Sequence, residues 1–342
     1  MKAVIFKGVG KYEIEDRPIP EVRKADDVKL KILAASICGS DVHILADPPG
    51  IDATPNIILG HECIAEIEDV GEEVMDLKVG DRVIMDNNLT CGVCKMCRLG
   101  HPNMCIRMNS MGSMSDGIFT EYAVVPEKAL IKISKDIPMK QAILAEPMNC
   151  TMGGMKKLNV LPGATAVVLG GGPIGLCFTA EFKARGAGRV IVSEMTELRT
   201  KVAYEVGADL VVNPAKESQK DKIMELTDGL GADIVVDCVG MLMQDAVDCV
   251  RPCGQVLLFG MNKNAVTPFH QIDITYKDLT VYGSYIGSYA LTHVANILNT
   301  NAVDLSKLVT HEYALEDFGE ALQAMRTQQA VKTVLYPHGK VE

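Results

Sequence analysis

The sequence predicts an α/β protein that combines a doubly wound parallel sheet with a second, β-rich domain. Two observations support this fold class. From about residue 164 to residue 260, apolar runs of strand length alternate with segments of helix length, as in parallel sheets with crossover helices. Before residue 150, short apolar runs are separated by Gly, Pro and Asp clusters, as in strands joined by turns. A chain of 342 residues is long enough for two domains, each with its own core.

The expected elements follow the chain in order. In the β-rich region the predicted strands are 28–33, 64–70, 82–85 and 122–125. In the alternating region the predicted strands are 166–169, 189–193, 210–213, 234–237 and 256–259, and the predicted helices are 173–185 and 197–206. The tail is predicted to form helices over 290–298 and 315–326 and a strand over 333–336. We expect this tail to pack back on the N-terminal domain.

The composition excludes several classes of protein. A net charge of -10 argues against a nucleic-acid partner, because such binding depends on clustered Lys and Arg. The N-terminus lacks the apolar run of a signal peptide, and the longest uncharged run, between Lys157 and Glu181, is broken by Pro and Gly. Eleven cysteines without a secretory signal favour metal ligands and buried thiols over disulfides. We therefore expect a cytoplasmic protein with no membrane partner.

A glycine-rich turn opens the alternating region. It has the form G-x-G-x-x-G and reads Gly170-Gly171-Gly172-Pro173-Ile174-Gly175, between a predicted strand and a predicted helix. In such a turn Gly170 makes the bend, Gly172 lets the backbone approach a pyrophosphate, and Gly175 lets helix and strand pack closely. The helix begins at Pro173 and Ile174, and its N-terminus then faces the phosphates with the free N–H groups of the first-turn residues that follow the proline. This context favours a Rossmann dinucleotide-binding domain over a glycine turn in another βα unit.

An acidic residue follows this turn at the expected distance. Glu194 ends the next predicted strand, 19 residues beyond Gly175. A carboxylate there accepts hydrogen bonds from the adenosine ribose and repels a 2'-phosphate, so we predict NAD rather than NADP as cofactor. Arg199 lies nearby in sequence and is a candidate partner for a 2'-phosphate, which would favour NADP instead.

Four cysteines lie within 15 residues in the β-rich region. They are Cys91, Cys94, Cys97 and Cys105. Four thiolates close a tetrahedral shell around Zn²⁺ and leave no position for water or substrate, so we predict a structural zinc lobe over 91–105. An iron–sulfur cluster and plain buried thiols are the alternatives, although the spacing differs from ferredoxin motifs.

A second group of metal-binding side chains lies between residues 38 and 62. Cys38-Gly39-Ser40-Asp41-Val42-His43 begins this stretch, and Gly60-His61-Glu62 ends it. Thiolate, imidazole and carboxylate together suit Zn²⁺, and a catalytic zinc needs three protein ligands and one open position. The alternative is a buried thiol and a surface His-Glu pair.

Taken together, these motifs resemble the zinc-dependent medium-chain dehydrogenases, and most closely their polyol (sorbitol-type) and threonine dehydrogenase branches. The resemblance spans the whole chain and includes the segments 116–122 and Glu146-Pro147. It implies a GroES-like catalytic domain formed by residues 1–155 and 288–342, and a Rossmann NAD-binding domain over 156–287. It also implies a homo-oligomer, either a dimer or a tetramer.

The resemblance further implies two Zn²⁺ per chain in addition to NAD. The catalytic zinc would be bound by Cys38, His61 and Glu62. Glu146 stands where the Cys₂His pattern of alcohol dehydrogenase has its second Cys, and it would either bind this zinc directly or hold its water. Ser40 and His43 would form a proton relay with the nicotinamide ribose, and His43 suits its surface end because an imidazole exchanges protons readily near neutral pH.

The implied reaction is the reversible oxidation of a secondary alcohol to a ketone. There is no Lys or Arg in 38–62, 109–123 or 279–290, and phosphate or carboxylate substrates usually meet a cationic clamp. A small neutral polyol is therefore favoured over L-threonine or a sugar-alcohol phosphate, which are the alternatives. Sorbitol-type enzymes carry an Arg where this chain has Ile286 and Gly287, so a smaller or less polar alcohol is also considered. The rival classes are a zinc-free reductase and a non-catalytic nucleotide-binding protein.

Overall fold

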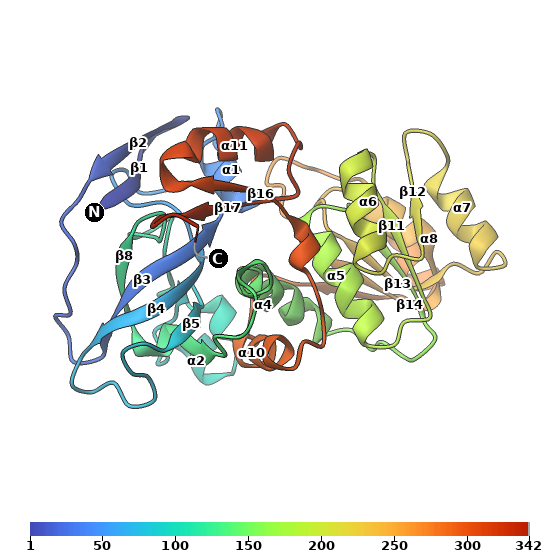
Figure 1. Cartoon of the computed structure of the whole chain (residues 1–342). Helices are drawn as coiled ribbons and strands as arrows, with labels where there is room; N and C mark the ends of the chain where they lie inside the picture. Colours follow the sequence, from blue (N-terminus) through green and yellow to red (C-terminus); the bar gives the residue numbers. More distant parts are fainter. Residues whose placement is uncertain (341–342) are drawn as a thin grey trace. The chain divides into compact units, whose positions relative to one another are not determined.

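The computed structural model describes residues 1–340, and Figure 1 shows the course of the chain. It separates into two compact units. The first contains Met1–Asn149, Ser288–Asn301 and the residues from Val309 onward, and the second contains Cys150–Gly287 and Ala302–Leu308. Residues 341 and 342 of the predicted 288–342 segment lie outside the described residues. None of the described helices is both long enough and apolar enough to cross a bilayer.

The first unit is built on a seven-stranded sheet, in which β16-β17-β3-β4-β5-β9 is the strand order and β8 pairs with β3. Its strands are β3 (Asp27–Ser36), β4 (Glu62–Val70), β5 (Arg82–Met85), β8 (Tyr122–Pro126), β9 (Leu130–Ile133), β16 (Val309–Ala314) and β17 (Lys332–Tyr336). The two C-terminal strands are parallel to each other, and β17 pairs antiparallel with β3. The tail thus completes the sheet that the N-terminal strands begin.

Shorter elements surround this sheet. They are the hairpin β1 (Lys2–Gly8) and β2 (Lys11–Asp16), the pair β6 (Asn88–Leu89) and β7 (Asn109–Ser110), and the helices α1 (Gly39–Ile44), α2 (Lys95–Arg98), α3 (Met139–Ala142), α10 (Leu291–Thr300) and α11 (Phe318–Arg326). The core joins residues distant in sequence, such as Phe119 and Phe318, whose ring centroids are 5.3 Å apart and whose side chains are fully buried. Burial of one such ring contributes about 1.5–3 kcal/mol.

The second unit contains a six-stranded parallel sheet in the order β12-β11-β10-β13-β14-β15. Its strands are β10 (Thr165–Leu169), β11 (Arg189–Ser193), β12 (Leu210–Val212), β13 (Ala232–Asp237), β14 (Val250–Leu258) and β15 (Thr280–Gly283). Its helices are α5 (Pro173–Ala184), α6 (Glu197–Glu205), α7 (Gln219–Leu226), α8 (Met243–Cys249) and α9 (Gln271–Tyr276). The strand order reverses between β10 and β13, which is where doubly wound sheets bind ligands. The predicted fold class is confirmed.

The division between the units differs from the predicted one at residue 155, and also at Ala302–Leu308, which belongs to the second unit although 288–342 was predicted to lie in the first. Helix α4 (Ala145–Met155) is continuous, but the division falls between Asn149 and Cys150. The second half of α4 packs with the parallel-sheet unit: Thr151 Oγ1 donates to Glu181, and a Cβ at Gly154 would touch Leu257 and Phe178. The two halves of one continuous helix thus belong to different units, which depends on tertiary packing and not on the local sequence pattern.

Glu181 makes the stability of the second unit depend on pH. Burial raises the pKa of its carboxyl from 4.5 to about 8, against the opposing effects of Thr151 and Arg185. Between these two values the folded chain holds one more proton than the unfolded chain, so stability falls as pH rises, by about 1.4 kcal/mol per pH unit. Glu181→Gln is expected to remove this slope. Urea unfolding at about pH 5.5 and about pH 7.5 gives the free energy of unfolding at each pH. If this free energy changed equally with pH in the variant and in the parent protein, Glu181 would not be the group responsible.

Candidate metal centre and cofactor site

Cys38, His61 and Glu62 lie together at one end of the seven-stranded sheet. Each offers one ligand atom, and these atoms are all within 4.8 Å of one another. The sheet register explains the meeting, because β3 and β4 are antiparallel and pair Ser36 with Glu62. Cys38 follows the end of β3 as the N-cap residue of α1, and His61 immediately precedes β4. His61 and Glu62 are buried, so a bound ion would be largely removed from water.

A buried carboxylate lies beside the imidazole of His61. Asp41 Oδ1 lies 3.6 Å from His61 Nδ1, and Asp41 Oδ2 accepts a hydrogen bond of 2.8 Å from Cys38 N–H. Burial alone would lower the pKa of His61, but the Asp41 carboxylate raises it well above its ordinary value. The 3.6 Å separation is too long for a hydrogen bond, and Asp41 Oδ1 has no hydrogen-bond partner within the described part of the chain. Asp41 therefore acts on His61 through its charge, and it faces Nδ1 and not Nε2.

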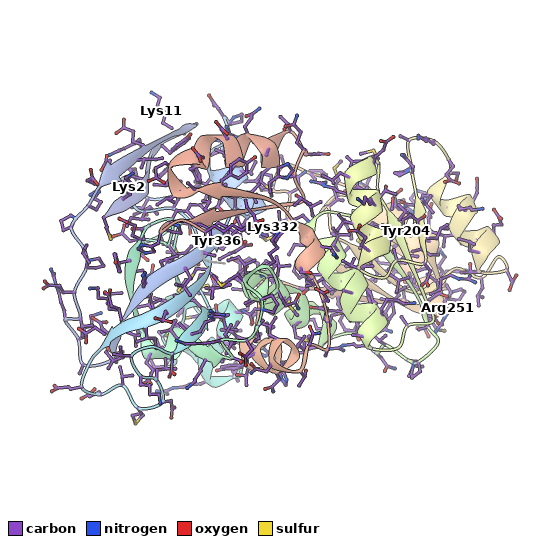
Figure 2. All side chains as sticks on the ribbon, in the orientation of Figure 1. Lys2, Lys11, Tyr204, Arg251, Lys332 and Tyr336 are labelled. Atoms are coloured by element: carbon purple, nitrogen blue, oxygen red, sulfur yellow. The ribbon has the colours of Figure 1, made fainter. Side chains whose placement is uncertain are left out.

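Glu62 is held by two residues that we did not predict from the sequence. Lys332 Nζ lies 2.8 Å from Glu62 Oε1 and 2.6 Å from Oε2, and Ser36 Oγ donates to Oε2. Lys332, labelled on β17 in Figure 2, is 1% exposed. Burial alone would lower the pKa of Lys332, but the charges of Glu62, Cys38 and Glu146 raise it above its ordinary value. The sequence contains one sign of this role, because Lys332 is a single charged residue within the mainly apolar segment 330–336.

The three remaining predicted residues of the catalytic group lie on α1 and α4. Ser40 and His43 are three residues apart on α1, which places them on one face of that helix. Ser40 Oγ is 3.3 Å from His61 Nε2, whereas the His43 side chain is exposed. Glu146 is buried in the first turn of α4 and is not among the three residues whose ligand atoms cluster. It is near enough for its charge to raise the pKa of Lys332.

The four cysteines of the 91–105 lobe converge as their spacing predicts. Their sulfur atoms lie within 4.8 Å of one another, and Cys94 Sγ is 3.5 Å from Cys97 Sγ and 3.9 Å from Cys105 Sγ. None forms a disulfide. Four sulfurs about 2.3 Å from one zinc stand about 3.8 Å apart, so the group fits this ion. The backbone N–H groups of Cys97 and Ile106 lower the pKa of Cys94 to about 6, whereas burial and the neighbouring Cys94 and Cys105 raise the pKa of Cys97 to about 12. A bound metal would therefore have to displace the proton of Cys97.

The glycine turn has the geometry that a dinucleotide requires. Gly170 has φ +101°, which favours glycine, and α5 begins at Pro173 with Gly172 as its N-cap. A Cβ at Gly175 would lie 1.9 Å from the carbonyl oxygen of Gly170. A Cβ at Gly172 would meet no atom within 4 Å, so the space beside the helix N-terminus is open. Ile174 follows within the first turn of α5.

Glu194 connects the glycine turn to the next helix. Its Oε2 accepts from Gly171 N–H at 3.0 Å, and its Oε1 accepts from Met195 and Thr196 N–H at 2.8 Å each. Arg199 Nη1 lies 3.9 Å from Oε2. The buried atoms Nε of Arg199 and Oγ1 of Thr196 have no hydrogen-bond partner within the described part of the chain. These polar groups suit a ribose with its hydroxyls.

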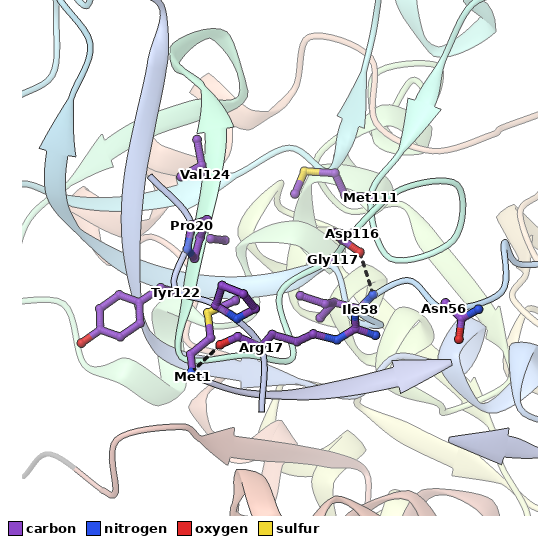
Figure 3. A pocket seen from close by; sticks show the side chains of 12 residues that line it. Met1, Arg17, Pro20, Asn56, Ile58, Met111, Asp116, Gly117, Tyr122 and Val124 are labelled. Atoms are coloured by element: carbon purple, nitrogen blue, oxygen red, sulfur yellow. Dashed lines mark hydrogen bonds between the residues drawn. The ribbon is translucent and has the colours of Figure 1, made fainter. Parts of the chain in front are cut away.

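A separate cavity of about 310 Å³ lies in the first unit (Figure 3). Met1, Arg17, Asp116 and Tyr122 are among its lining residues, and the Met1 amino group donates to Arg17 O at 2.6 Å. None of the predicted site residues lines it. The cavity is therefore distinct from the metal centre.

Comparison with known proteins gives a family match for the N-terminal part of the chain and another for the dinucleotide-turn part. Residues 24–135 match the family described as "Alcohol dehydrogenase GroES-like domain", and residues 173–300 match "Zinc-binding dehydrogenase". The L-threonine 3-dehydrogenase of Thermococcus kodakarensis is 34% identical over 91% of each chain. The sorbitol dehydrogenase of Halalkalibacterium halodurans is 32% identical over 98% of this chain and 99% of its own.

Among solved structures, an alcohol dehydrogenase from Escherichia coli CFT073, complexed with NADH, superposes with a TM-score of 0.90 and 28% identity. It covers 98% of this chain and 99% of its own. With the sequence matches, the fold and the clustered ligand atoms in agreement, the chain belongs to the zinc-dependent medium-chain dehydrogenase family.

Proposed function

We propose that the protein reversibly oxidises a small neutral polyol or related secondary alcohol to a ketone, with NAD⁺ as hydride acceptor. The observation that carries this proposal is the cluster of Cys38, His61 and Glu62 ligand atoms in a chain whose second unit has a dinucleotide turn. A non-catalytic nucleotide-binding protein would have no use for such a cluster. A zinc-free reductase would not need it either.

The donor sets fit two zinc ions per chain. Cys38, His61 and Glu62 would hold the catalytic ion, and the four cysteines of the 91–105 lobe would hold the structural one. When bound, the catalytic zinc supplies a Lewis acid that lowers the pKa of an alcohol, and the nicotinamide accepts the hydride. To Glu146, which is buried but outside the ligand cluster, we assign the role of holding a water molecule or of approaching the ion from α4.

Ser40 and His43 provide the route by which a proton leaves the buried site. The Ser40 hydroxyl lies beside the metal-facing nitrogen of His61 and is placed to accept a proton from a substrate hydroxyl. His43 lies one helical turn further along α1 and is exposed, so it delivers the proton to water. An imidazole suits this role because its ordinary pKa is near neutral.

The adenosine end of the site favours NAD. Glu194 is 6% exposed and keeps one negative charge at the turn, where a 2'-phosphate would bring two more. Glu194→Ser is expected to lower the preference for NAD over NADP by about tenfold or more, since like charges brought together cost several kcal/mol and Arg199 becomes free to pair with the phosphate. The ratio of kcat/KM values for the two cofactors measures it.

Glu197 supplies the matched control for this substitution. It is also a carboxylate in the first turn of α6, but it is exposed. Glu197→Ser should leave the cofactor preference unchanged. An unaltered ratio in Glu194→Ser itself would remove Glu194 from cofactor selection.

The substrate proposal rests on charge. Lys332 is a cation that contacts the metal cluster, and its ammonium group is already hydrogen-bonded to both carboxylate oxygens of Glu62. It is therefore not available to bind the carboxylate of threonine or a phosphate. An NADH absorbance assay with polyols, butanediol, threonine and sugar-alcohol phosphates tests this. The highest kcat/KM should belong to a neutral diol or polyol, and preference for an anionic substrate would refute the proposal.

We also propose a homo-oligomer that forms through the edge of the parallel sheet. Among the described strands β15 pairs only with β14, and the neighbouring helix α9 buries no residue. Ile272 and Tyr276 on α9 are 62% and 88% exposed. An open strand edge beside apolar side chains suits a second copy of the chain. Analytical ultracentrifugation should show a dimer or tetramer, and Tyr276→Glu should shift it toward the monomer.

A further inference from the structure

Lys332 reaches the metal centre from the far end of the chain. Strand β17 pairs Val334 with Ser36, and Ile37 N–H donates to Thr333 O at 3.2 Å, which sets Lys332 beside the segment that leads to Cys38. Its ammonium group makes three contacts: the two oxygens of Glu62 and Ile37 O, at 3.3 Å. An ammonium has three N–H donors, so all are used. A lysine with this burial and this complete set of partners is held in one position.

The hydrogen bonds to Glu62 are unequal. Its Oε2 accepts from both Lys332 and Ser36, whereas its Oε1 accepts from Lys332 alone. A carboxylate oxygen has two lone pairs. Both lone pairs of Oε2 are therefore occupied, and one lone pair of Oε1 remains.

We propose that Lys332 and Ser36 are positioning residues that let Glu62 approach the catalytic metal through Oε1 only. This inference rests on the proposed function, because it needs a metal at Cys38 and His61. A carboxylate that binds through one oxygen completes three protein ligands and keeps the fourth position for substrate. If both oxygens could bind, Glu62 would fill that position itself.

Lys332 also contributes to the charge balance of the metal site. The Cys38 thiolate and the Glu62 and Glu146 carboxylates together carry three negative charges, against two positive charges on a zinc ion. Lys332 offsets part of the remaining negative charge, to which the buried Asp41 carboxylate beside His61 also contributes. Without it, Glu62 would have the metal as its main source of positive charge and would turn both oxygens toward it.

Cobalt substitution tests the inference without relying on activity. Co²⁺ would be exchanged into the catalytic site of the full chain while zinc stays in the four-cysteine lobe, and metal content per chain would be measured. Four-coordinate Co²⁺ absorbs visible light much more strongly than five- or six-coordinate Co²⁺. Lys332→Met is expected to weaken the visible band several-fold and to lower kcat by about 10–100-fold. Lys332→Arg, which keeps the charge, should restore most of the band.

Two further variants keep the test decisive. Ser36→Ala frees one lone pair of Oε2 and should weaken the band in the same direction, even if Lys332→Met does not fold. Lys135→Met removes an exposed ion pair with Glu66 on the same unit and should leave the spectrum unchanged. Parental spectra in folded Lys332→Met and Ser36→Ala would overturn the inference. Failure of the parent protein to take up cobalt at Cys38 and His61 would instead overturn the proposed function.

Discussion

Cys38→Ser is expected to lower kcat/KM for alcohol oxidation by about a thousandfold or more. The thiolate of Cys38 is the one sulfur in the Cys38, His61 and Glu62 cluster, and a serine hydroxyl is a far weaker ligand for zinc. A Lewis acid supplies several kcal/mol of transition-state stabilisation, and each 1.4 kcal/mol is about tenfold in rate. The change should appear in kcat/KM from NADH absorbance, together with the loss of one metal equivalent per chain.

The neighbouring Cys63 provides a matched control for this result. It is buried on β4 next to Glu62, and burial raises the pKa of its thiol to about 12, so it stays protonated. Cys63→Ser should keep both metals and most of the activity. The four-cysteine lobe is distant in sequence and should retain its metal in both variants. If Cys38→Ser kept more than about a tenth of the parental kcat/KM, Cys38 would not be a ligand of the catalytic metal.

The parts of the site that could be predicted from the sequence are those whose residues are close together in the chain. The four cysteines of the lobe and the glycine turn each lie within one short segment. The spacing of the residues in the sequence therefore determines how they lie in space. Cys38 and Glu62 are farther apart, but a single antiparallel strand pair brings them together. In each case local chemistry and simple topology suffice.

The partners of Glu62 could not be predicted in this way. Lys332 lies 270 residues from Glu62 and meets it only because β17 joins β3 in the same sheet. The segments 38–62, 109–123 and 279–290 contain no Lys or Arg, and Lys332 lies outside all three. The lysine interrupts an apolar strand, which is the local conflict that often marks a functional residue. The division within α4 was hidden for a similar reason, because it depends on packing rather than on local pattern.

Gly175→Ala is expected to lower both the stability of the parallel-sheet unit and the affinity for NAD. The added Cβ would lie 1.9 Å from Gly170 O and 3.1 Å from Val168 Cγ1, so α5 must move away from β10. Overpacking of this kind costs about 1–3 kcal/mol. The same shift displaces the helix N-terminus from the pyrophosphate, and we expect the Kd for NAD to rise by about tenfold or more. Thermal unfolding and calorimetric titration with NAD measure the two effects.

Gly172→Ala separates these two effects. Gly172 has φ -71°, which any residue can adopt, and a Cβ there would meet no protein atom within 4 Å. Its Tm should therefore stay close to that of the parent protein. The methyl group would instead occupy the space beside the N-terminus of α5, so the affinity for NAD should fall as it does in Gly175→Ala. Unchanged NAD binding in Gly172→Ala would show that the pyrophosphate does not approach the backbone at this glycine. Unchanged stability in Gly175→Ala would show that α5 and β10 have room to separate.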